Sequence, residues 1–201
     1  MEIERASIQE RFQHLYSVIS GERFLKKQGL GNEIPFFICP FKPQEAVEME
    51  RLQKQLANRL EQNGVRVLDI NLYDLCLSIL KQEGDLDWYL TNEAFVTKSQ
   101  LLEDLQKILD VEATVIPTMA KIMASTDFDV MFLSGVGIVF PLIRSHNVLN
   151  NLQSKAKEKP TLMFFPGTYT HSLEKGASLD LFGKLHDDKY YRAFNIFHCE
   201  P

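Results

Sequence analysis

The sequence predicts an α/β fold: a three-layer α/β/α sandwich around a mainly parallel sheet of about five strands, Rossmann-like or P-loop-like but without a Walker motif. Short apolar runs alternate with stretches in which apolar residues recur every three or four positions, as in strands separated by amphipathic helices. Strands joined through helices pair in parallel with right-handed crossovers. The chain has 201 residues, 45% of them hydrophobic, so we expect one domain over residues 1–201.

The first element is an amphipathic helix that leads into the sheet. Apolar residues recur in it at spacings of four, three and four: Ile8, Phe12, Leu15 and Ile19. We expect the helix to end near Gly21 and a turn to follow at Gly29–Asn32. The continuously apolar run Ile34–Cys39 then predicts a strand buried on both faces, so residues 1–30 form a helix and turn before the sheet.

A long covering helix and a second strand come next. Pro43 suits a first helical turn, and Gly64 supplies a left-handed stop. One side of this helix is expected to pack on the sheet through Val47, Leu52, Leu56 and Leu60. Val65–Ile70 predicts the second strand, and Asn71 caps a helix that runs to Gly84.

The middle of the chain predicts a mainly helical insertion over residues 85–125. Asp85–Val96 is less regular, whereas Thr97–Gln100 has the pattern of a capping box at the start of a helix. Helical spacing continues to Met123, with Pro117 either kinking that helix or opening its first turn.

Three further apolar segments complete the predicted sheet. They are Asp129–Leu133, Thr161–Phe165 and Arg192–Phe197. A helix from about Ile138 to Gln153 separates the first two, and Pro166-Gly167 is expected to break the strand before it.

Composition excludes several classes of protein. The net charge of −5, from 22 basic and 27 acidic side chains, argues against direct nucleic-acid binding, which depends on clustered Lys and Arg. Neither a signal peptide nor a membrane span is present, so a cytoplasmic protein is expected.

Cys39, Cys76 and Cys199 are far apart and odd in number, which favours buried free thiols over disulfides or zinc.

The carboxyl ends of parallel strands are where ligands gather in α/β sheets. Candidates for ligand or partner binding therefore follow the second, third and fourth strands: Asn71, Tyr73, Asp74, Ser134, Gly135, Gly137, Gly167, Thr168 and Tyr169. The turn Ser134–Gly137 before a helix would expose backbone amides to a phosphate, but no P-loop lysine follows it, and Phe140 stands where a third glycine belongs. We favour close packing of strand and helix as the reason for these glycines.

A polar cluster follows the turn and contributes the candidates Arg144, His146 and Asn147. Arg144, Asn147 and Asn151 would share one helix face. Ser145 and His146 cannot act as nucleophile and base, because neighbours diverge by about 100° around a helix. A partner interface or bonding to backbone groups is the preferred interpretation.

His186–Arg192 contains residue types that ligate metals, but its spacing resembles no known metal site. A turn before an edge strand is the better interpretation. We therefore predict no catalytic residue, no metal and no cofactor for this chain.

Several segments, taken together and in order, resemble the BrxB family of bacterial BREX phage-defence systems. They are Gly29–Ile38, Asn71–Leu75, Leu133–Gly137, Arg144–His146, Leu149-Asn150, Phe164–Gly167 and Tyr190–Phe194. The resemblance implies a protein that works with a DNA methyltransferase, a large ATPase and an alkaline-phosphatase-like component. It assigns no catalytic residue.

Two function hypotheses follow from different classes. The first is a non-catalytic assembly factor that binds other BREX components, foremost the alkaline-phosphatase-like one, with a homodimer also compatible with the fold. The alternative is a nucleotide or phosphate-ligand sensor that uses the Gly135–Gly137 turn, with Asn71, Asp74, Arg144 and Thr168 around the crevice. A hydrolase built on Cys39 or Ser134 has only residue types in its favour.

Overall fold

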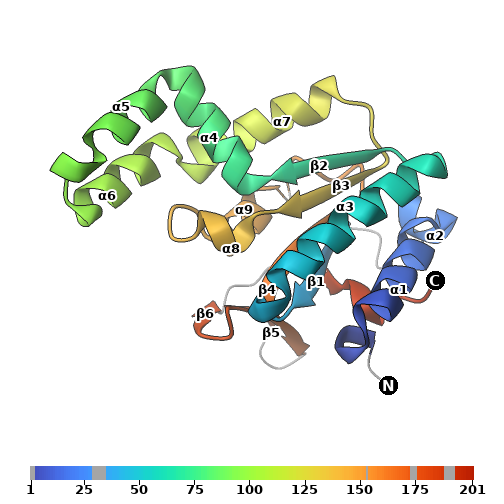
Figure 1. Ribbon diagram of the computed structural model, residues 1–201. Coiled ribbons are helices and arrows are strands. Elements are labelled where there is room, and N and C mark those ends of the chain that lie inside the picture. The colour runs from blue at the N-terminus through green and yellow to red at the C-terminus, as the bar shows by residue number, and fades with distance from the viewer. Residues whose placement is uncertain (1–2, 29–34, 153, 173–175, 188–192) are drawn as a thin grey trace.

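The computed structural model describes residues 3–28, 35–152, 154–172, 176–187 and 193–201 (Figure 1). In this part of the chain a parallel sheet has the strand order β2-β3-β4-β1-β7. Its strands are β1 (Phe36–Phe41), β2 (Val67–Asn71), β3 (Val130–Ser134), β4 (Thr161–Ser172) and β7 (Phe194–Asn195). Helices cover both faces, which confirms the predicted three-layer fold.

One face of the sheet is covered by α1 (Ile8–Ile19) and α3 (Ala46–Gln62), with α3 lying across the front in Figure 1. The short helices η1 (Ile3–Arg5), α2 (Glu22–Leu25), η2 (Pro43–Glu45) and η5 (Ile196–His198) accompany them. The helix predicted from Ile8 to Ile19 is confirmed, and Ser7 caps it through a capping box with Glu10.

The buried stripe of α3 differs from the prediction at Val47. The buried residues are Met49, Leu52, Gln53, Leu56 and Leu60. Val47 was expected among them but is 59% exposed. It precedes Met49 by two residues, about 200° around the helix, so it lies outside the stripe that packs on the sheet.

The opposite face is covered by α4 (Leu72–Glu83), α7 (Ile116–Ser125) and α9 (Ser145–Leu152). The connection from β1 to β2 crosses β4 and β3 in one direction, whereas β2, β3 and β4 follow one another in the other direction. Because crossovers are right-handed, this reversal places α3 and α4 on opposite faces.

The helix predicted from about Ile138 to Gln153 is in fact two helices. α8 is a single turn of four residues, Val136–Val139, and α9 begins only at Ser145. Pro141 lies between them, and it has no N–H with which to continue a helix. Arg144 therefore precedes α9 rather than sharing a helix face with Asn147 and Asn151.

The prediction that Pro166-Gly167 breaks the fourth strand is wrong. β4 continues to Ser172 and pairs in antiparallel fashion with β5 (Gly176–Leu181), which pairs with β6 (Leu185–Asp187). A Cβ at Gly167 would lie 2.1 Å from the carbonyl oxygen of Asp180. The glycine is thus required by the close approach of two strands, not by a turn.

The segment from 85 to 125 contains α5 (Asp85–Asn92), η3 (Glu93–Phe95), α6 (Lys98–Ile108), the π-helical turn η4 (Val111–Val115) and α7. The stretch expected to be less regular thus contains helix α5, which starts directly after the left-handed Gly84. Pro117 stands in the first turn of α7, the second of the two positions expected for it, directly after η4.

The closing strand β7 lies beside β1, although only two residues of it are paired. The predicted turn at Gly29–Asn32 and the start of the closing segment at Arg192 lie outside the described residues. Among the described helices, none combines the length and the apolar character needed to cross a lipid bilayer.

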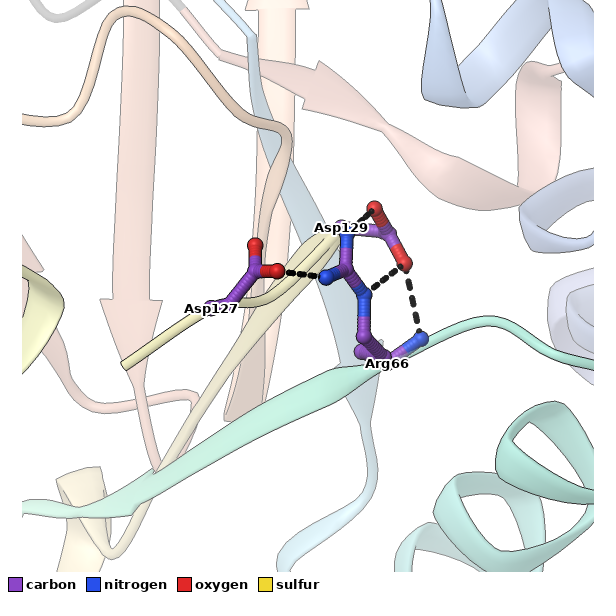
Figure 2. A network of polar contacts seen from close by, with 3 residues as sticks. All are labelled: Arg66, Asp127 and Asp129. Atoms are coloured by element: carbon purple, nitrogen blue, oxygen red, sulfur yellow. Dashed lines mark hydrogen bonds and ion pairs between the residues drawn. The ribbon is translucent and has the colours of Figure 1, made fainter.

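An ion-pair network joins the amino ends of β2 and β3 (Figure 2). The Arg66 guanidinium donates to both Asp129 carboxylate oxygens, Nε to Oδ2 at 2.9 Å and Nη2 to Oδ1 at 2.7 Å, and it also contacts Asp127. The backbone N–H of Arg66 donates to Asp129 at 2.9 Å. These bonds from Arg66 lower the pKa of Asp129 to about 2.

We expect Asp129→Asn to lower the melting temperature at pH 7 by about 2–4 °C, because a bidentate pair at the edge of the sheet is lost. A carboxylate with a lowered folded-state pKa stabilises the fold above its ordinary value of 3.8, and this contribution disappears as the pH falls toward about 2. The melting temperatures of the unmodified chain and of Asp129→Asn should therefore converge between pH 4 and pH 2. Asp127→Asn, at a more exposed carboxylate, is the matched control, and a constant difference across this pH range would contradict the assignment.

Candidate binding crevice and helical arm

A crevice opens at the carboxyl ends of the central strands. The chain leaves β1 toward α3 on one face and leaves β3 toward α8 on the other, with β4 between them. A cavity of about 400 Å³ lies at this divergence, the position at which α/β sheets bind ligands. Its lining comes from Phe41, Pro43, Ala46, Val47, Met49, Glu50, Gln53, Asn71, Ser134–Ile138, Phe164, Pro166 and Phe182.

The walls of this cavity are mainly apolar. Phe164 and Pro166 of β4 contribute on one side, and the side chains of Val47 and Ile138 are 59% and 65% exposed. These two exposed aliphatic residues, one from α3 and one from α8, add to the apolar lining. The crevice is therefore suited to receive apolar groups from another molecule.

The predicted candidates Asn71, Ser134, Gly135 and Gly137 meet in this crevice. Asn71 Oδ1 accepts the backbone N–H of Tyr73 at 2.9 Å and that of Asp74 at 3.3 Å, which caps α4. Gly135 has φ +74°, and a Cβ there would lie 2.3 Å from Asn71 Oδ1. The glycine thus allows the turn after β3 to pass directly over the cap of α4.

Gly137 serves packing. A Cβ on it would lie 2.8 Å from Pro166 Cγ and 3.0 Å from Phe182 Cε1, so side chains already occupy the space in front of its backbone. Phe182 has a left-handed backbone with φ 57°, a conformation that non-glycine residues rarely adopt. Its ring also packs edge-on against Phe140 at 6.4 Å between centroids. The favoured packing role of the glycine agrees with this geometry.

A second compartment of about 450 Å³ adjoins the first and is more polar. The two share Glu50, Gln53, Asn71 and Ser134. The second is also lined by Lys54, Asp69, Ile70, Asp74, Leu75, Ser78 and Ile122. The apolar first compartment is therefore continuous with a second compartment that is lined by charged side chains.

Carboxylates outnumber cations in this second compartment. Lys54 Nζ donates to Glu50 Oε1 at 2.6 Å, which raises the pKa of Lys54. Gln53 Nε2 donates to Asp69 Oδ1 at 2.8 Å. Withdrawal from solvent raises the pKa of Asp69; the hydrogen bond from Gln53 and the positive charge of Lys54 oppose this rise, and the negative charge of Asp74 adds to it. Three carboxylates thus face one ammonium group.

Arg144 and His146 do not reach the crevice, contrary to the expectation for Arg144. They line a separate cavity of about 190 Å³ with Phe140, Ser145, Leu179, Leu181, Lys184 and Leu185. His146 is buried and Arg144 is exposed at the start of α9. The carbonyl oxygen of Asn147 accepts from Asn151 Nδ2 at 2.8 Å, so these two residues do share a helix face.

Gly167, Thr168 and Tyr169 do not lie in a turn at a strand end, because β4 continues through them. Thr168 Oγ1 donates to Asp180 Oδ2 at 3.4 Å across the β4–β5 pair, away from the crevice. The Tyr169 hydroxyl donates to the carbonyl oxygen of Ala193 at 2.6 Å, and burial raises its pKa to about 12. Tyr73 is exposed on the first turn of α4.

Of the two residues proposed for a hydrolase, Ser134 lines the crevice and Cys39 is a core residue. Cys39 is fully buried, and burial raises the pKa of its thiol well above the ordinary value. Cys76 and Cys199 are buried too, with pKa values raised to about 12 and about 11. In the part of the chain that the structure describes, no group of three or more His, Cys, Asp or Glu side chains is placed to hold a metal ion.

Most of the crevice lining comes from residues that the sequence did not single out as site candidates. They include the residues of β1, η2 and α3 together with Phe182. The sequence could have indicated that Val47 is exposed, since it is out of phase with the buried stripe at Met49, Leu52 and Leu56. Nothing in the sequence could have indicated Phe182 as a crevice residue, because β5 and β6 were not predicted.

A second surface is formed by residues 85–108, here termed the helical arm, which comprise α5, η3 and α6. Figure 1 shows α5 and α6 at the end of the molecule away from α1 and α2. The structure describes every residue of the arm, and none is buried. Trp88 is 52% exposed, Leu90 65% and Phe95 84%. Only Leu86, Leu105 and Ile108 at its base pack on the core.

Comparison with known proteins identifies the family. A family model described as BREX protein BrxB matches residues 68–196. The chain is 34% identical over 191 residues to a BREX protein BrxB of Bacillus cereus (strain H3081.97), covering 94% of this chain and 97% of the relative.

The chain belongs to the BrxB family. A second relative, a BREX protein BrxB of Escherichia coli O9:H4 (strain HS), is 29% identical over 189 residues, which cover 94% of this chain and 91% of the relative. No solved structure matches the chain. The family resemblance seen in the sequence is thereby confirmed, and the BrxB model includes the arm and the turn after β3.

We expect Gly135→Ala to destabilise the fold by about 2–3 kcal/mol, because it adds left-handed strain to the loss of the Asn71 cap. Gly183→Ala is the matched control: it also has a positive φ, 66°, but nothing lies within 4 Å of an added Cβ. It should cost about 1 kcal/mol, the strain alone. Urea unfolding of the two variants measures the difference, and equal losses would show that Asn71 is not displaced.

Proposed function

We propose that this BrxB-family chain is a non-catalytic component of a BREX phage-defence system and acts as an assembly factor that binds other BREX proteins. The alkaline-phosphatase-like component is the first candidate partner, ahead of the methyltransferase, the large ATPase and a second copy of this chain. Membership of the BrxB family supports the BREX assignment. The exposed helical arm is the observation that carries the binding role.

The arm is difficult to explain as part of an isolated protein. Its helices place Trp88, Leu90 and Phe95 against water, although burying a large apolar side chain is worth about 1.5–3 kcal/mol. Trp is also among the residues enriched at energetically dominant positions of protein interfaces. Trp88 and Leu90 lie about 200° apart around α5, so a partner that covers either side of this helix would recover part of that energy.

The crevice does not favour the alternative of a nucleotide or phosphate sensor. α8 is only four residues long, Gly137 is covered by Pro166 and Phe182, and carboxylates outnumber cations in the second compartment. Arg144, the cation expected to supply charge, lines a different cavity. An anionic ligand would meet repulsion there rather than a positive site.

Affinity purification of the tagged chain from cells that express the whole BREX system should recover the alkaline-phosphatase-like protein at gentle salt. The double variant Trp88→Ala and Leu90→Asp should reduce that recovery at least tenfold, because it changes both sides of α5: it removes an aromatic anchor at one side and places a charge on the other.

The control is Leu185→Asp, which adds the same charge at an exposed leucine of β6, outside the arm. It should retain the partner, and thermal melts should show that both proteins are folded. If the unmodified chain recovers no BREX protein, the assembly role is contradicted. If the arm variant recovers as much partner as the unmodified chain, the arm is not the binding surface.

A further inference from the structure

We infer that the crevice between α3 and the turn after β3 receives an extended segment of a partner protein in which apolar side chains are followed by a lysine or arginine. This inference rests on the proposed function, since it assigns a chemistry to one contact of an assembly factor. It concerns a different surface from the helical arm.

The apolar part of the segment is indicated by the first compartment. A cavity of about 400 Å³ is lined by Phe164, Pro166 and Phe182, and Val47 and Ile138 in the same lining are more than half exposed. A cavity of this size is within the range that proteins use to bury small apolar groups. Aliphatic or aromatic side chains entering it would cover both exposed residues.

The basic residue is indicated by the second compartment. Lys54 is held by Glu50, at 2.6 Å between Nζ and Oε1. Within the described residues, neither Asp69 nor Asp74 has a cationic side chain within 4 Å. An incoming ammonium or guanidinium group would complement these carboxylates and form charge-assisted hydrogen bonds.

The two compartments form one continuous site. Glu50, Gln53, Asn71 and Ser134 line both, so a single chain passing along α3 contacts the apolar walls and then the carboxylates. This arrangement selects against nucleic acid and anionic lipid headgroups, which the carboxylates repel. It also places the apolar part of the segment toward Phe182 and its basic residue toward Asp74.

A random peptide library displayed on phage and selected on the full-length immobilised chain tests this chemistry. The expected result is enrichment of peptides that carry Leu, Ile or Phe with a Lys or Arg at a fixed spacing. A selection that enriches nothing above the empty support, or enriches peptides without a basic residue, overturns the inference.

The best enriched peptide is then synthesised, and its affinity for purified variants is measured by calorimetry. Ile138→Asp and Asp74→Lys should each weaken it at least tenfold. A peptide whose basic residue is replaced by Glu should recover affinity for Asp74→Lys but not for the unmodified chain. Unchanged affinity in both variants, or failure of this charge exchange, would also overturn the inference.

Two controls keep folding separate from binding. Glu48→Lys reverses a charge in the first turn of α3, next to the crevice but outside its lining, and Leu185→Asp matches Ile138→Asp at an exposed apolar residue. Both should change peptide affinity less than twofold. Unchanged thermal melts show that Ile138→Asp and Asp74→Lys are folded.

The outcomes separate this inference from the proposed function. If BREX proteins co-purify with the chain but no basic-apolar peptide is enriched, the assembly role stands and the crevice assignment fails. If such peptides bind the crevice but no BREX protein co-purifies, the crevice assignment stands and the assembly role fails.

Discussion

The right-handedness of parallel crossovers is the constraint on which this structure depends. The chain travels from β1 across the sheet to β2 and then returns through β3 to β4, so its connecting helices are forced onto opposite faces. That reversal separates α3 from the turn after β3 and leaves Phe164 and Pro166, in the middle of β4, between them as the floor of the crevice. The site follows from chain direction before any side chain is considered.

Local sequence patterns were sufficient to predict most of the helices and strands. The stripe from Ile8 to Ile19, the buried run at Val130–Leu133 and the Asn71 cap each specify their element through nearby residues alone, and all three appear in the structure. The failures involve distant contacts. Pro166-Gly167 reads locally as a turn, but its glycine accommodates the carbonyl of Asp180, and Pro141 interrupts a helix whose apolar spacing continues through it.

The candidate site was predicted only in part for the same reason. Strand ends can be located from sequence, so Asn71, Ser134 and Gly135 were found. The opposite wall comes from β1, η2, α3 and Phe182, whose proximity depends on strand order and on the unpredicted β5–β6 hairpin. The arm and the crevice are two surfaces of different chemistry: the arm exposes Trp88, Leu90 and Phe95, and the crevice is apolar with an acidic end.

The three-way contact of Gly137, Pro166 and Phe182 has a consequence for the history of the family. A side chain added at position 137 would enter space occupied by the other two, which come from a different strand and from a hairpin. Drift at these positions is therefore not independent: a larger residue at 137 must be accompanied by a smaller one at 182 or by a shift of the hairpin. Among BrxB relatives, the residues at positions 137, 166 and 182 should therefore change together. Their combined size should set the width of the crevice in each relative.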